Sequence, residues 1–111
     1  MLGEKKGEAM AFTEVEVQEA EAAIVAGAKA EDLFRLGLMY STELEDRGVD
    51  YIEAHKWFNL AALMGSAPAK AYRDEIKAEL SVEELTLAQK AARGWLAENR
   101  ELVEDAKKEA A

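Results

Sequence analysis

The chain has no cysteine, one proline and one histidine among its 111 residues. The absence of cysteine excludes disulfides, thiolate nucleophiles and cysteine-ligated zinc. A histidine-based triad or metal site would need further ligands or catalytic groups around His55, and the sequence offers only Asn59, one helical turn later. We therefore expect no catalytic residue, no cofactor and no metal ligand, and we expect His55 to be an exposed or half-buried helix residue.

Long apolar runs and an excess of basic residues are also missing. No stretch approaches the roughly 20 apolar residues that span a bilayer, and the first residues lack the apolar segment of a secretion signal. The net charge is −9 and the isoelectric point about 4.6. Because an acidic protein repels phosphate backbones and anionic lipids, we expect no nucleic acid and no membrane as partner. Since a membrane-spanning run and a secretion signal are both missing, we expect a cytoplasmic location.

The acidic loop around Gly48 is a candidate calcium site, since carboxylates can coordinate a hard cation. If Gly48 takes the sixth position of a calcium loop, Arg47 takes the fifth and Ala54 the twelfth, where a carboxylate is required. A guanidinium among the ligands opposes calcium, so we expect these loop charges to be solvated.

The residues that are abundant favour helices. The chain is 50% hydrophobic and 33% charged, which suits one compact domain, and alanine, leucine, glutamate, lysine and methionine are good helix formers. We expect an all-α domain over residues 13–111, preceded by a tail over 1–12 whose order the sequence leaves open. We expect five helices: Thr13/Glu16 to Gly27, Ala30 to Thr42, Asp50/Glu53 to Gly65, Pro68 to Leu80, and Ser81/Glu84 to the C-terminus. Polar capping pairs mark the starts of the first, third and fifth helices, Pro68 marks the start of the fourth, and glycines mark the ends of the first and third.

Apolar residues recur at helical spacing within these segments, which predicts the faces that build the core. The stripe of the second segment is Leu33, Leu36, Gly37 and Tyr40; the third carries Ala54, Trp57, Phe58, Ala61 and Ala62; the fourth carries Ala71, Tyr72, Ile76 and Leu80; the last carries Leu85, Ala88, Ala92, Trp95, Leu102 and Ala106. Gly37 and the alanines are expected to let antiparallel helices approach closely, with Tyr40 and Trp57 filling the remaining space.

A repeat is indicated by Gly27 and Gly65, which lie 38 positions apart, a separation typical of helical-hairpin repeats. Between them the chain reads Leu36-Gly37-x-x-Tyr40, Gly48, Asp50-Tyr51-x-x-Ala54 and Trp57-Phe58-x-x-Ala61-Ala62-x-x-Gly65. This pattern resembles the Sel-one-like repeats, relatives of the tetratricopeptide repeats, and is clearest over residues 30–65. The loop departs from the family at Glu43, where a glycine is usual. The resemblance implies a right-handed α-solenoid fragment of about five helices with a long C-terminal capping helix.

The function that the resemblance implies is a non-catalytic interaction module or adaptor for a peptide or partner protein. We expect the binding surface to include six residues on the second and fourth helices: Arg35, Met39, Thr42, Lys70, Arg73 and Lys77. The alternative for these charges is that they only solubilise helix surfaces. A second functional hypothesis is self-association into a homo-oligomer through the C-terminal helix or the open repeat ends.

Overall fold

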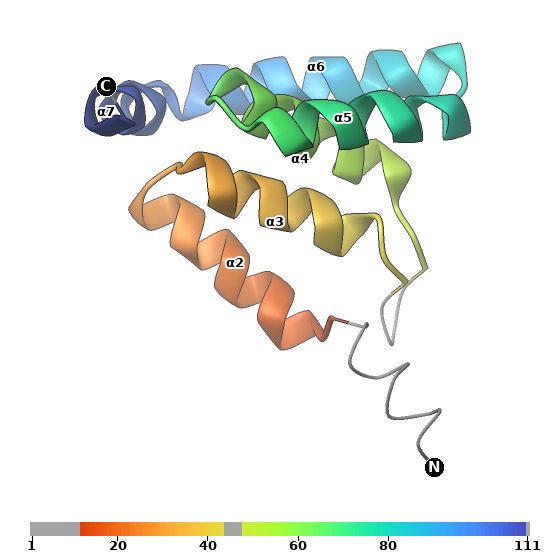
Figure 1. The fold of residues 1–111 in the computed structure, drawn as a ribbon, viewed down its shortest axis with the longest axis horizontal. Coiled ribbons are helices and arrows are strands. Elements are labelled where there is room, and N and C mark those ends of the chain that lie inside the picture. Colours follow the sequence, from red (N-terminus) through yellow and green to blue (C-terminus); the bar gives the residue numbers. More distant parts are fainter. Residues whose placement is uncertain (1–11, 44–47, 111) are drawn as a thin grey trace.

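The computed structural model describes residues 12–43 and 48–110, and this part of the chain contains helices and no strands (Figure 1). The prediction of an all-α fold is therefore confirmed. The elements are α2 (Glu14–Ala26), α3 (Ala30–Tyr40), α4 (Tyr51–Leu63), α5 (Ala67–Ile76), the 3-10 turn η1 (Lys77–Glu79), α6 (Val82–Glu98) and α7 (Arg100–Ala110). The predicted tail over residues 1–12 lies outside this part except for Phe12.

Polar caps begin the helices where the sequence predicted them. Thr13 and Ser81 each form a complete capping box with the glutamate three residues later. At α4 only half of the box forms: the Asp50 carboxylate accepts from the Glu53 N–H at 3.1 Å. The Asp50 N–H donates instead to the Tyr40 carbonyl oxygen at 2.9 Å. The backbone N–H that the Glu53 carboxylate was expected to accept from is therefore bonded to the last residue of α3.

The C-terminal region is two helices, and the prediction of one long capping helix was wrong. Asn99 ends α6 with φ −122° and ψ 34°, which is not helical. Its N–H and its side-chain Nδ2 both donate to the Trp95 carbonyl oxygen at 2.9 Å. Asparagine competes with the helix for backbone partners in this way, so α7 starts in a new direction and is seen end-on in Figure 1. The described residues thus form six α-helices, where about five were expected.

Helix α4 lies at the centre of the packing, in contact with α3, α5 and α6, while α2 packs against α3. The α3–α4 contact depends on Gly37: a Cβ placed there would lie 2.5 Å from the Phe58 Cε1 atom. The predicted close approach at Gly37 is confirmed. A glycine with positive φ occurs at the end of α4, where Gly65 has φ +107°. Gly48, in the loop before α4, does not have a positive φ.

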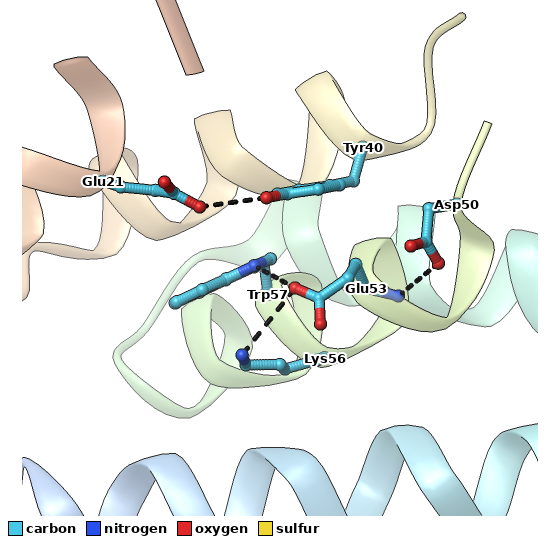
Figure 2. Close-up of polar contacts among 6 residues, drawn as sticks. All are labelled: Glu21, Tyr40, Asp50, Glu53, Lys56 and Trp57. Carbon is cyan, nitrogen blue, oxygen red and sulfur yellow. Dashed lines mark hydrogen bonds and ion pairs between the residues drawn. The ribbon is translucent and has the colours of Figure 1, made fainter. Parts of the chain in front are cut away.

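Tyr40 and Trp57 lie in the core, as predicted, and are 8% and 6% exposed. The Tyr40 hydroxyl donates to Glu21 Oε2 at 2.9 Å, which joins α3 to α2 (Figure 2). The Trp57 Nε1–H donates to Glu53 Oε1 at 3.0 Å, and that same oxygen lies 3.7 Å from Lys56 Nζ. Each ring therefore buries its carbon surface while its polar atom has a partner.

Three expectations about faces need correction. On α5 the core residues are Ala69 and Ile76, whereas Ala71 and much of Tyr72 are exposed. Helix α5 packs against α4, and Ala69, one helical turn after the Ser66 cap, is fully buried. His55, expected to be exposed or half-buried, is 3% exposed, because it follows Ala54 on the side of α4 that α5 and α6 cover.

Candidate binding sites

The structure separates the six predicted surface residues. Arg35 is exposed on α3. Thr42 is partly exposed, and its hydroxyl donates to the Leu38 carbonyl oxygen at 2.8 Å. Met39 is fully buried, so its prediction as a surface residue was wrong. It lies one i,i+3 step after Leu36 and extends the buried stripe of α3.

The three basic residues predicted on the fourth helix do not lie together. Lys70 is exposed at the start of α5. Arg73 and Lys77 line a cavity of about 230 Å³, together with residues of α4 and α6. The cavity lies on the side of α5 where Arg73 contacts Asn59 of α4. On another side of the same helix, Tyr72 contacts Phe34 of α3. Helix α5 therefore contributes to two separate candidate sites, one around Tyr72 and one around Arg73 and Lys77.

The first place is an aromatic cluster formed by Phe34, Phe58 and Tyr72. The ring centroids are 5.8 Å apart for Phe34–Phe58, 5.6 Å for Phe34–Tyr72 and 5.5 Å for Phe58–Tyr72, the last pair being stacked. Phe58 is fully buried and Phe34 partly buried, while Tyr72 remains 42% exposed. The Tyr72 ring is thus held by Phe34 and Phe58, and its exposed part is open to a ligand.

Phe34 and Tyr72 are 38 positions apart, the same separation as Gly27 and Gly65. Trp57 and Trp95 are also 38 positions apart, and their rings meet edge to face with centroids at 5.8 Å. Sequence reasoning missed Phe34 as a site residue. Extending the 38-residue period from the glycines to the aromatic residues would have found both pairs.

The second place is the cavity between α4, α5 and α6. Its lining residues are His55, Asn59, Arg73, Asp74, Lys77, Leu85 and Gln89. Arg73 is held from two sides: its Nη1–H donates to Asn59 Oδ1 at 3.0 Å and its Nε–H to Asp74 Oδ1 at 3.2 Å. Side-chain exposure is 24% for Arg73 and 61% for Asp74, so the guanidinium is the more enclosed partner.

His55 is the buried polar residue of this cavity. Its Nδ1 atom is buried and has no hydrogen-bond partner among the described residues. Burial lowers the pKa of His55 below its ordinary value of 6.5, the positive charges of Arg73 and Lys77 lower that pKa further, and Asp74 opposes them. The imidazole is therefore neutral at neutral pH and lies in a locally positive field, in a chain whose net charge is −9.

No group of acidic, histidine or cysteine side chains within residues 12–43 and 48–110 is arranged to hold a metal ion. None of the helices described is long and apolar enough to cross a membrane. Comparisons of the chain with family models, with curated proteins and with solved structures gave no match.

Proposed function

We propose that the chain is a helical-repeat module that binds a peptide segment of another protein. The observation that carries the proposal is the pair of ring contacts between residues one 38-residue period apart, Phe34 with Tyr72 and Trp57 with Trp95. Contacts between equivalent positions are what stacking of successive hairpins produces. They support the resemblance to Sel-one-like repeats, in which α3–α4 is one unit and α5–α6 begins the next.

The surface proposed for the peptide is the Phe34/Tyr72 face, made by α3 and α5. Tyr72 stacks on Phe58, so its ring loses little freedom when a ligand covers it. Its hydroxyl has no hydrogen-bond partner within the described part of the chain, which leaves a polar group for the ligand. Tyrosine is among the residues that are enriched where binding energy concentrates.

The proposal is tested by selecting peptides from a random display library against the full chain and measuring their affinity by calorimetry. We expect Tyr72→Ala to weaken a selected peptide by tenfold or more, about 1.4 kcal/mol or above, and Tyr72→Phe to retain most of the affinity. Leu87→Ala is the matched control, because Leu87 is 55% exposed on α6, away from the aromatic cluster. Equal affinity for the parent chain and Tyr72→Ala would contradict the proposed surface.

Light scattering over a concentration series distinguishes the competing hypothesis of self-association. We expect a monomer whose mass is independent of concentration. A stable dimer whose formation is prevented by Tyr72→Ala would mean that the aromatic surface serves a second copy of the chain and not a foreign peptide.

A further inference from the structure

We propose that the cavity between α4, α5 and α6 binds a small oxyanion, the carboxylate or phosphate group of a ligand, through Arg73, Lys77 and His55. The cavity is distinct from the Phe34/Tyr72 face, so the proposal stands independently of the peptide-binding function. The proposal rests on the residues that line the cavity, which include two cations, two side-chain amides and a buried imidazole.

The charges that face the cavity favour an anion. Arg73 comes from α5 and Lys77 from η1, and the single carboxylate is that of Asp74. The residues contributed by α4 and α6 are His55, Asn59, Leu85 and Gln89, none of which carries a negative charge. Since Asp74 is more exposed to solvent than Arg73, its charge is better screened, and the net field at the cavity is positive.

Arg73 is also oriented to bind. Its Nη1 and Nε atoms each donate one hydrogen bond, to Asn59 and to Asp74. A guanidinium has five N–H donors, so three remain in a fixed plane for a ligand. Because Asn59 Oδ1 accepts from Arg73, the amide nitrogen of Asn59 is a further donor.

His55 is the buried ring of the cavity. It lines the cavity with only 3% of its surface exposed, and its Nδ1 is buried without a partner among the residues described. A buried N–H without an acceptor is rarer than a buried acceptor without a donor. Nδ1 is therefore taken as the unprotonated nitrogen, which an oxyanion does not bind, and the proton lies on Nε2, the nitrogen that can donate to an oxygen atom.

The test uses nuclear magnetic resonance on the full-length chain, in which the single histidine gives unambiguous ring signals. Inorganic phosphate and acetate are titrated separately at constant ionic strength. We expect saturable shifts of the His55 ring signals with at least one of the two anions. Because a bound anion offsets the field of Arg73 and Lys77, we also expect the pKa of His55 to rise on binding.

Three variants test the assignment. Arg73→Gln and Lys77→Gln should each weaken the anion by roughly tenfold, the loss of one charge-assisted hydrogen bond. Lys70→Gln is the control, since it removes the same charge from the same helix at a residue that does not line the cavity. Circular dichroism checks folding, and if Arg73→Gln does not fold, the exposed Lys77 decides the test.

Saturation by phosphate alone identifies a phosphate site, by acetate alone a carboxylate site, and by both a general oxyanion site. An absence of saturable shifts with either anion would overturn the proposal. Equal weakening by Lys70→Gln and Lys77→Gln would also overturn it, because the effect would then reflect only the overall charge.

Discussion

Gly37 of α3 lies directly against the Phe58 ring of α4, and no side chain larger than hydrogen fits between them. A Cβ at position 37 would meet the Phe58 Cε1 atom at 2.5 Å, well inside van der Waals contact. Phe58 is fully buried and is itself stacked on Tyr72. The close α3–α4 contact and the proposed binding face therefore depend on the same ring.

Replacing Gly37 by alanine is expected to lower the free energy of unfolding by about 1–3 kcal/mol, because the added methyl group must displace Phe58. Urea unfolding followed by circular dichroism measures the change. Gly94→Ala is the matched control: a Cβ there meets nothing within 4 Å on α6, so the higher helix propensity of alanine should raise stability by about 0.5–1 kcal/mol. Similar effects of the two changes would contradict the assigned role of Gly37.

Trp57→Ala is expected to cost about 3–5 kcal/mol, the usual range for removing a buried tryptophan. The ring contacts Trp95, and Lys56 Nζ lies 4.4 Å from its centroid. Since domains of this size are stable by about 5–15 kcal/mol, this loss would remove about a fifth of the stability or more. Thermal unfolding by calorimetry gives the value, and a loss below about 1 kcal/mol would show that Trp57 does not hold α4 against α6.

The Tyr40–Glu21 hydrogen bond should couple α2 to α3. Tyr40→Phe removes the hydroxyl that donates to Glu21 Oε2 (Figure 2), and we expect a loss of about 1 kcal/mol in unfolding free energy. A double-mutant cycle with Glu21→Ala, which removes the acceptor, isolates the pair from other contacts of Tyr40. A coupling energy indistinguishable from zero would mean that α2 is held by its apolar face alone.

Burial of His55 predicts a specific pH dependence. The pKa of His55 is lowered in the folded protein below the ordinary value of 6.5, so the unfolded chain binds the proton more tightly. The stabilisation from the neutral ring is complete above pH 6.5 and is lost as the pH falls from there through the folded pKa. His55→Gln should remove this part of the pH dependence. Urea unfolding at a series of pH values compares the two chains, and parallel curves would contradict the prediction.

Local patterns in the sequence predicted most helix boundaries. The capping boxes at Thr13 and Ser81 are predictable because each depends on a glutamate three residues later. The close contact at Gly37 is predictable because it depends on one residue without a side chain. The half-formed box at Asp50 depends on Tyr40, which is ten residues earlier in the chain, so the partner of its N–H could not be predicted from local spacing. The apolar positions thin out after Leu96 and Asn99 falls on the apolar stripe, which marks the end of the last helix as less certain. The spacing did not predict a second helix there, because an asparagine inside an apolar stripe is compatible with either continuing or ending a helix.

The binding sites were less predictable because they depend on how helices turn about their axes. Met39 was placed on the surface and is buried, and His55 was placed near the surface and is buried. Arg73 and Lys77 were grouped with Arg35, although α5 directs them to a cavity with α4 and α6. The 38-residue period, visible in Gly27/Gly65 and in the two aromatic pairs, was the long-range signal in the sequence.

The proposed peptide-binding face is tested most directly by mapping backbone amide shifts of the labelled chain during titration with a selected peptide. The account predicts that the largest shifts fall on α3 and α5 around Phe34 and Tyr72, accompanied by shifts of the Tyr72 ring protons. Largest shifts confined to α6 and α7, with the Tyr72 ring unchanged, would contradict it.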